Sequence, residues 1–351
     1  MKMMPRFSVC IPNYNLGHFI GETIQSVLDQ TFSDFEIIIV DNASTDDSVN
    51  VIESFEDDRI RLYQNNYNIG FSPNLQAVTQ RATGEFLILL SSDDLMAPNA
   101  LEQYDQVLKE QGGRAQQTVL CAATQMVDEN NQVSLVCVRP SGDIIPKWVP
   151  EGEINTIPLK RKDQISGRAA LRTSLFNCSS LATFCSTAYP RSMWEKVQGY
   201  DTTYSYFPDN VFLYKLLLSD PDFIWINEPL FSYRVHSSNQ DALAAKQSAI
   251  KYQVDGYMQT VAYPNENLYL LGLSRDDLVR SFLKVVCIDD SLGKLTRGAW
   301  VQALKIFLFA FATYPGRALK IPKTYAALFL LALGPLGIQL AKLARKVFID
   351  T

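Results

Sequence analysis

Short apolar runs alternate with amphipathic stretches along the first hundred residues. Three of these runs have the length of a buried strand, residues 7–11, 36–40 and 85–90, and residues 60–64 are expected to form a further short strand. Three stretches between them carry apolar side chains at helical spacing: residues 20–29, 44–56 and 73–82. This order predicts an α/β fold, in which helices flank both faces of a mostly parallel, Rossmann-like sheet.

Beyond residue 97 the pattern is less regular. We expect further helices at residues 98–111, 163–176, 191–197 and 209–219. We expect a strand pair over residues 119–138 that turns at 128–131, and single strands at 183–189, 223–226 and 230–235. Residues 139–162 lack periodicity and carry four prolines, which predicts a long loop.

From about residue 238 the pattern becomes helical, most clearly over residues 240–261, 274–292 and 299–313. We therefore expect two domains, an α/β domain over residues 1–237 and a helical extension over 238–351.

Within the extension, the segment Thr324–Ala341 carries no charged residue, but its 18 residues are fewer than the ~20 that span a bilayer. Gly334-Pro335 interrupts it, and eight Lys and Arg against one acid lie between Arg297 and the last residue. This combination predicts a broken helix in the interface of an anionic membrane. Packing into a core of its own and true spanning remain alternatives.

Composition narrows the class of protein. The chain has 351 residues, 47% of them hydrophobic, and a net charge of −5, which suits a globular protein and does not indicate a nucleic-acid partner. The six cysteines show no CxxC spacing and only two histidines are present, so we expect free thiols and no multi-histidine zinc site. The amino terminus shows no secretory signal, because its first apolar run is short and is followed by Asn13 and Asn15. A cytoplasmic location is expected.

Acidic side chains follow two of the predicted strands directly. The strand over residues 85–90 leads into Ser91, Ser92, Asp93 and Asp94, and the strand over 36–40 leads into Asp41. Ligands of doubly wound sheets bind outside the carboxyl ends of the strands. Paired carboxylates there can hold Mg²⁺ or Mn²⁺, and a single one can accept a base N–H or a ribose hydroxyl. The alternative for each acid is a role as helix cap or turn residue.

The sequence of motifs resembles the family 2 glycosyltransferases, which have the GT-A fold and transfer sugars from nucleotide donors with inversion. The resemblance covers roughly residues 5–236. It rests on these features, in order: Pro12-x-Tyr14-Asn15, Val40-Asp41-Asn42-x-Ser44-x-Asp46, Asn68-x-Gly70 with Asn74, Ala82-x-Gly84-Glu85-Phe86 and Ser92-Asp93-Asp94.

The resemblance implies a set of donor-binding residues: Pro12, Tyr14, Asn15, Asp41, Asn68, Gly70, Asn74, Asp93 and Arg234. It further implies a divalent metal, Mn²⁺ or Mg²⁺, at Asp94 and Asp93 with His236. Many family members have an acid where this chain has Ser91, so two carboxylates remain here. A purely structural role for His236 is the alternative.

The resemblance also implies a catalytic acid at the start of a helix that follows a Gly-aromatic-Asp turn. Gly199-Tyr200-Asp201 is that turn, and Asp209 is the expected general base, although Pro208 stands where many relatives have Glu. A helix cap is the alternative role for Asp209, and Asp201 is the alternative base.

The expected function is that of a metal-dependent inverting glycosyltransferase, peripheral at the inner face of the cell membrane. Its donor would be a UDP- or dTDP-type sugar and its acceptor a saccharide or lipid-linked saccharide, as in cell-surface polysaccharide or lipopolysaccharide biosynthesis. A nucleotidyltransferase should instead show a Gly-rich, Arg-containing loop where this chain has Pro12–Asn15. A sugar-nucleotide-binding or membrane-scaffolding protein without transferase activity is the other alternative.

Overall fold

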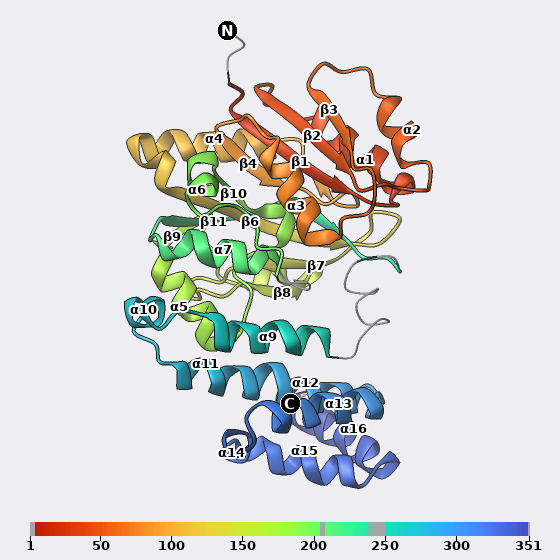
Figure 1. Cartoon of the computed structure of the whole chain (residues 1–351), viewed down its shortest axis with the longest axis vertical. Helices are drawn as coiled ribbons and strands as arrows, with labels where there is room; N and C mark the ends of the chain where they lie inside the picture. Colours follow the sequence, from red (N-terminus) through yellow and green to blue (C-terminus); the bar gives the residue numbers. More distant parts are fainter. Residues whose placement is uncertain (1–3, 204–207, 238, 240–249, 350–351) are drawn as a thin grey trace. The chain divides into compact units, whose positions relative to one another are not determined.

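The computed structural model describes residues 4–203, 208–237, 239 and 250–349. The chain forms two compact units (Figure 1). The first comprises Met1–Leu171 and Ser180–His236, and the second comprises Arg172–Ser179 and Ser237–Thr351. A short piece near residue 175 therefore belongs to the second unit, although it lies far from the rest of that unit in the sequence.

The first half of unit 1 contains the predicted alternation of strands and helices. Its strands are β1 (Phe7–Asn13), β2 (Phe35–Asp41), β3 (Ile60–Gln64) and β4 (Phe86–Leu89). They are parallel and lie in the order β3-β2-β1-β4. The connecting helices are α1 (Gly17–Leu28), α2 (Ser48–Glu53) and α3 (Phe71–Gln80). The predicted α/β fold with a parallel sheet is confirmed here.

Alternate residues of the strands pack on opposite faces of this sheet. Phe7, Val9 and Ile11 of β1 share a buried core with α1, α2 and α4 (Ala100–Gln111). Helix α3 packs against β1 and β2 without contributing to that core. Both faces of the sheet are therefore covered, which explains the continuous apolar character of β1 and β2.

The second half of the sheet is mixed rather than parallel. Strand β10 (Ala188–Pro190) runs antiparallel between β4 and β6 (Thr118–Val127), and β6 pairs in parallel with β11 (Asp222–Arg234). Strand β7 (Val133–Val138) forms the predicted hairpin with β6. The remaining strands are short and peripheral: β5 (Leu95–Met96), β8 (Lys147–Pro150) and β9 (Lys162–Ser166).

Several predicted boundaries differ from the structure. The helix expected at 163–176 begins only with α5 (Gly167–Asn177), because residues 162–166 pair with β11 as β9. The two strands expected between 223 and 235 are one strand, β11, with register shifts near Pro229. The loop over 139–162 contains β8 and a 3-10 helix. These are edge elements whose partners are distant in the sequence, so local periodicity does not indicate them.

Two further helices complete unit 1. Helix α6 (Arg191–Lys196) follows β10, and α7 (Pro208–Leu218) precedes β11. Between α5 and β10 lies the 3-10 turn η3 (Phe184–Ser186), in a region where the sequence pattern predicted one strand over 183–189.

Unit 2 is helical over its described residues, with its own core around Phe282, Leu283 and Ile306. Its elements are α9 (Lys251–Ala262), α10 (Asn265–Leu270), α11 (Arg275–Ser281), the π-helix η4 (Phe282–Asp289), α12 (Asp290–Thr296), α13 (Trp300–Thr313), α14 (Pro315–Ala318), α15 (Pro322–Ala332) and α16 (Pro335–Ile349). Gly334, with φ of 54°, separates α15 from α16 at the predicted break. Residues 240–249, part of an expected helix, lie outside the described residues. Among the helices that the structure describes, none combines the length and the apolar character needed to cross a bilayer.

Candidate functional site

The carboxyl ends of β1, β2 and β4 meet at one edge of the sheet. Asn13 at the end of β1 pairs with Asp41 at the end of β2, and Cys10 of β1 pairs with Leu89 of β4. The acidic turn, residues Ser91 to Asp94, begins two residues after the end of β4. Asp41 and the acidic turn therefore lie at the same edge, where parallel strands place their ligands.

Asp41 is buried and held by three donors. Its Oδ1 accepts hydrogen bonds from Asn13 Nδ2 at 2.8 Å and Ser44 Oγ at 2.6 Å, and its Oδ2 accepts from the Ser44 amide at 2.8 Å. The bond from Ser44 is that of a turn aspartate, so the structural role considered for Asp41 is present. A carboxylate has about four acceptor positions. Three contacts leave Asp41 room for one further donor.

The turn after β1 is hydrogen-bonded to the turn after β2. Asn15 donates its backbone N–H to Ser44 Oγ at 2.9 Å, and its side-chain oxygen accepts from the Thr45 amide at 2.8 Å. Pro12 is buried within β1, whereas 43% of Tyr14 is exposed. Tyr14 is thus the side chain of this group that a ligand can reach most easily.

A network of asparagines fixes the loop before α3. Asn68 Oδ1 accepts from the Gly70 amide at 2.8 Å and from Asn42 Nδ2 at 2.9 Å. Asn74 is buried, donates to the Val40 carbonyl at 3.1 Å and accepts from Asn65 Nδ2 at 3.0 Å. Asn68 lies at the exposed rim, while Asn74 ties the helix to the end of β2.

Asp93 and Asp94 are both buried in the acidic turn. Asp93 accepts from the Ser91 hydroxyl, and its Oδ2 lies 2.8 Å from His236 Nε2. Asp94 Oδ1 accepts from the backbone N–H of Arg234 at 3.0 Å. Burial and the neighbouring charge of Asp93 raise the pKa of Asp94 well above its usual value of 3.8. Two adjacent carboxylates withdrawn from water form a site that gains from a bound cation.

Arg234 packs against the acidic turn and holds it in place through hydrogen bonds. Its Nε donates to the Asp93 carbonyl at 2.9 Å, and its Nη2 pairs with Glu22 Oε2 at 2.7 Å. The guanidinium carbon lies 4.8 Å from the centre of the Phe19 ring, which also contacts the His236 ring at 4.4 Å. Since the Arg234 side chain is fully buried, it connects β11, the acidic turn and α1 rather than reaching outward. Phe19 and Glu22 belong to this site, but in the sequence they look like ordinary positions of an amphipathic helix.

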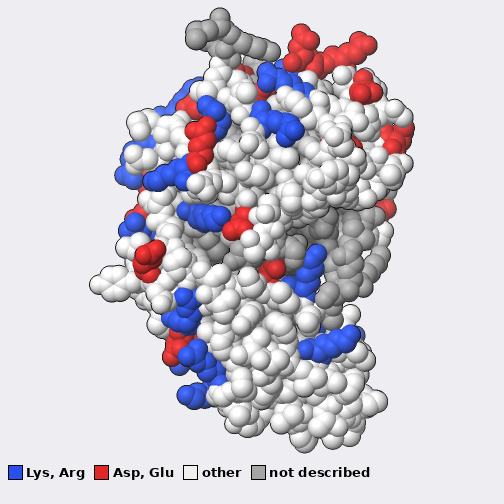
Figure 2. All heavy atoms as spheres, viewed as in Figure 1, with Lys and Arg blue, Asp and Glu red and all other residues white. Residues whose placement is uncertain are grey.

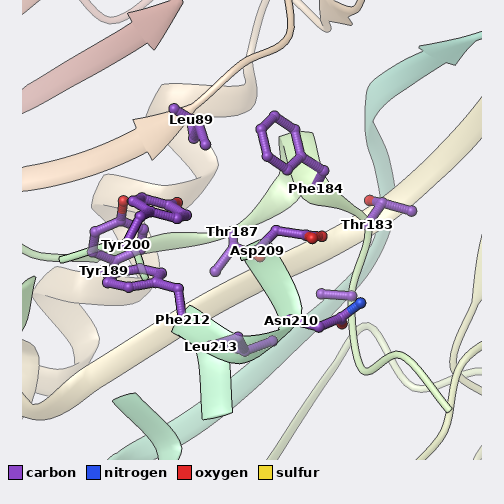
Figure 3. Close-up of a pocket in the computed structure, with 11 residues that line it drawn as sticks. Leu89, Thr183, Phe184, Thr187, Tyr189, Tyr200, Asp209, Asn210, Phe212 and Leu213 are labelled. Atoms are coloured by element: carbon purple, nitrogen blue, oxygen red, sulfur yellow. The ribbon is translucent and has the colours of Figure 1, made fainter. Parts of the chain in front are cut away.

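Asp209 lies in the first turn of α7 and lines a pocket. Figure 3 shows its carboxylate in the space between Phe184 and Asn210. The ring of Tyr200 stacks on Phe212 at 4.3 Å on the apolar side of this pocket.

Asp201, the alternative base, is not among the residues that line the pocket. It accepts from the Thr203 amide at 2.9 Å and pairs with Lys215 at 3.4 Å. The geometry therefore favours Asp209 over Asp201 as a group that can meet a ligand.

The turn η3 connects the pocket to the acidic turn. Phe184 lines the pocket, and the thiol of the next residue, Cys185, is hydrogen-bonded to Asp94. The Phe184 ring also lies 6.2 Å from the ring of Phe71, which follows Gly70 at the start of α3. The Asp209 pocket, the acidic turn and the asparagine loop thus meet around η3, which sequence periodicity did not indicate.

The donor atoms of the acidic turn are of the kind that a divalent metal prefers. The two carboxylates suit Mn²⁺ or Mg²⁺, and a bound cation would offset the burial and the Asp93 charge that raise the pKa of Asp94. Within the part of the chain that the structure describes, however, three or more such side chains do not converge as a complete metal cage. A metal here would need further oxygen ligands from a diphosphate, as is usual for Mg²⁺.

The chain is similar to known glycosyltransferases over much of its length. Residues 8–178 match the model of the family described as glycosyl transferase family 2. An uncharacterized glycosyltransferase of Rickettsia prowazekii is 25% identical over 69% of this chain and 68% of its own length.

Two relatives with stated activities match a shorter part. A UDP-Glc:alpha-D-GlcNAc-diphosphoundecaprenol beta-1,3-glucosyltransferase of Escherichia coli is 36% identical over 29% of this chain. A GalNAc(5)-diNAcBac-PP-undecaprenol beta-1,3-glucosyltransferase of Campylobacter jejuni is 37% identical over 28%. The matches cover 41% and 33% of these two enzymes, respectively, which is less than half of each.

The fold is shared with a solved glycosyltransferase structure. Crystal structures of Staphylococcus aureus TarS residues 1–349 with UDP and with UDP-GlcNAc superpose with TM-scores of 0.53 and 0.52, at 16% and 17% identity. They cover 94% and 88% of this chain and 92% and 91% of the TarS chains. The sheet flanked by helices, the family match and these relatives agree, and residues 8–178 therefore form a glycosyltransferase family 2 domain.

Proposed function

We propose that the protein is a metal-dependent, inverting glycosyltransferase in which Asp209 is the general base. One observation carries this proposal. A carboxylate at the start of α7 lines a pocket that shares the turn η3 with a buried pair of acids. A base beside an anionic turn that suits a metal is an arrangement that fits sugar transfer from a nucleoside diphosphate.

We assign the donor to the edge where β1, β2 and β4 end. Asp41, with one acceptor position to spare, would receive a base N–H, and Tyr14, Asn15, Asn68 and Gly70 would border the nucleoside. A UDP- or dTDP-type sugar fits this assignment, since TarS was crystallised with UDP and UDP-GlcNAc.

Three of the predicted donor-binding residues would act indirectly. Pro12 and Asn74 are buried and fix the strand ends, and the side chain of Arg234 is buried below the acidic turn. We infer that they shape the donor site rather than touch the nucleotide.

The reaction would be a single displacement. The acceptor oxygen attacks the anomeric carbon, the bond to the diphosphate breaks, and its electron pair leaves with the diphosphate. Asp209 takes the proton of the acceptor hydroxyl as this oxygen attacks. Asp93, Asp94 and His236 would hold the Mn²⁺ or Mg²⁺ ion, which when bound supplies positive charge to the leaving group.

We further propose a lipid-linked or other saccharide acceptor and a peripheral position at the inner face of the cell membrane. The names of the E. coli and C. jejuni relatives both include an undecaprenol-linked sugar. Cell-surface polysaccharide or lipopolysaccharide assembly is the process in which such a transfer would belong.

Replacing Asp209 tests the assignment of the base. The variant Asp209→Asn keeps the shape of the side chain but cannot take a proton, so transfer should fall by about 10²–10⁴-fold. Donor binding, measured by calorimetry with Mn²⁺ and a panel of nucleotide sugars, should remain near the wild-type level. The matched control is Asp201→Asn, which should transfer sugar at nearly the wild-type rate.

Two results would refute parts of this proposal. Transfer by Asp209→Asn at the wild-type rate would show that another group is the base. A wild-type protein that binds a nucleotide sugar but neither transfers nor hydrolyses it would instead be a binding protein.

A further inference from the structure

We propose that the outer face of the α15–α16 hairpin is the surface by which the protein lies on an anionic lipid bilayer. We call this the hairpin face and define it by six exposed apolar residues: Tyr325, Leu328, Phe329, Leu336, Leu340 and Leu343. The inference deepens the membrane location proposed above and names the elements responsible for it.

Helix α15 has one face buried in unit 2 and the opposite face exposed, and both are apolar. Thr324, Ala327 and Leu331 are buried at helical spacing. On the other side, 51% of Leu328 and 61% of Phe329 are exposed. In a helix that faces water this side would be polar. The exposed side of α15 therefore needs an apolar or interfacial environment.

Helix α16 continues the same pattern after the break. Leu336, Leu340 and Leu343 recur at helical spacing and are exposed, whereas Ala341 is buried. A methyl group on Gly337 would overlap the carbonyl oxygen of Leu330, so the two helices pack closely where this glycine lies. The hairpin is thus a compact unit, and Figure 2 shows a mostly uncharged surface over the part of the molecule that contains α15.

The chain segment that carries the hairpin face is basic, although Asp289 pairs with Lys323 and Asp276 with Arg317. The sequence contains no acid between residues 297 and 349, and exposed Lys305, Lys320 and Lys342 lie on or next to helices of this segment. Each basic residue near an anionic membrane contributes to binding, and the apolar side chains add to it by burial.

An anionic bilayer suits this face better than a second copy of the chain. Two such faces in contact would bring lysines of the same sign together, with no acid in this segment to pair with them. Helix α15 comprises only Pro322–Ala332, about half the ~20 residues that cross a bilayer, so the hairpin would lie in the interface and not span it.

The test measures binding of the purified full-length protein to phosphatidylcholine vesicles with and without phosphatidylglycerol. Wild type should sediment with the anionic vesicles. The double variant Leu328→Ser/Phe329→Ser should lose at least about tenfold in partitioning, because two large side chains no longer enter the interface. The matched control is Tyr269→Ser/Leu270→Ser on α10, where 85% and 51% of the side chains are exposed. This control should bind like wild type.

A second pair of variants tests the charge. Lys320→Gln/Lys342→Gln should weaken binding to anionic vesicles by about tenfold and have little effect on neutral ones. Thermal unfolding and donor binding of every variant should match wild type, which excludes misfolding as the cause.

The possible outcomes separate the inference from the proposed location. Vesicle binding by wild type that the hairpin variants do not reduce would overturn the hairpin face but leave the membrane location standing. Wild type that binds neither the neutral nor the anionic vesicles would overturn both the hairpin face and the membrane location. A wild-type dimer in sedimentation velocity that Leu328→Ser/Phe329→Ser converts to a monomer, without any vesicle binding, would assign the face to a second copy instead.

Discussion

At the scale of single residues, the buried carboxylates of the acidic turn lower the stability of the folded protein. Asp93 and Asp94 are adjacent and buried, and the pKa of Asp94 is raised by burial and by the charge of Asp93. Such an arrangement disfavours the ionised form of Asp94 and so favours unfolding, in which this carboxylate meets water. A cation bound as proposed would offset this cost.

Asp94→Asn should therefore stabilise the metal-free protein while it weakens catalysis. In unfolded wild type, Asp94 ionises near pH 3.8, whereas in the folded protein it holds its proton to higher pH. Wild type thus loses stability as pH rises above about 4, and the asparagine variant does not. Urea unfolding in EDTA should show a difference near zero at pH 3.5 that grows to about 1 kcal/mol or more at pH 7.

The control for this experiment is Asp34→Asn. Asp34 is exposed, so its replacement should change the free energy of unfolding by less than about 0.5 kcal/mol at either pH. An Asp94→Asn variant that is less stable than wild type at pH 7 would contradict the argument. It would mean that the bond from the Arg234 amide outweighs the burial of charge.

The positions of Asp41, Asp93 and Asp94 at one edge follow from the sequence, because Asp41 ends one apolar strand and Asp93 and Asp94 come a few residues after another. The role of Arg234 does not follow. Its partner Glu22 lies 212 positions away, and the local pattern of polar and apolar residues does not indicate such a pair. The positions of side chains at strand ends can be predicted from the sequence, whereas contacts formed by tertiary packing cannot.

At the scale of elements, the chain just before β4 passes close to the backbone of β1. Gly84 N donates to Ser8 Oγ at 2.8 Å, and Ser8 Oγ in turn donates to the buried carboxylate of Glu36 at 2.6 Å. A methyl group on Gly84 would lie 2.6 Å from Ser8 Oγ and 2.8 Å from the carbonyl carbon of Phe7. The glycine of the Ala82-x-Gly84 motif is thus needed for packing against β1.

Gly84→Ala should destabilise the protein by about 1–3 kcal/mol, because backbone atoms of β1 must move to admit the methyl group. The matched control is Gly113→Ala in the 3-10 helix after α4, where an added methyl group would meet nothing within 4 Å. Thermal unfolding of both variants measures the difference. Equal melting temperatures would show that the close approach at Gly84 relaxes without cost.

The same scale shows why some elements were missed. β1, β2 and β4 are buried on both faces and stand out as apolar runs, so their positions could be predicted closely. β5 has two residues, and β8 and β9 each pair with a single neighbour. Such edge strands need neither a long apolar run nor strict alternation, and they are defined by partners that the sequence does not reveal.

At the scale of the whole molecule, the chain has two separate hydrophobic cores, one in each unit. The core of unit 1 surrounds the sheet, and the core of unit 2 surrounds Phe282 and Leu283; the two buried clusters share no residue. The change from alternating to helical pattern near residue 238 indicated a second unit. It did not indicate that Arg172–Ser179 belongs to it, because this segment continues a helix that begins in unit 1.

Separate cores imply that changes in the two units act independently, as substitutions without shared contacts usually do. Asp209→Asn should sediment with anionic vesicles like wild type, and Leu328→Ser/Phe329→Ser should transfer sugar to a short water-soluble acceptor at the wild-type rate. With an acceptor anchored in vesicles, the hairpin variant should lose activity by about the same factor as it loses binding, because fewer enzyme molecules meet the acceptor. Radiolabelled sugar transfer to both acceptors measures this, with Tyr269→Ser/Leu270→Ser as control. A hairpin variant that is equally impaired with both acceptors would show instead that unit 2 is coupled to the catalytic site.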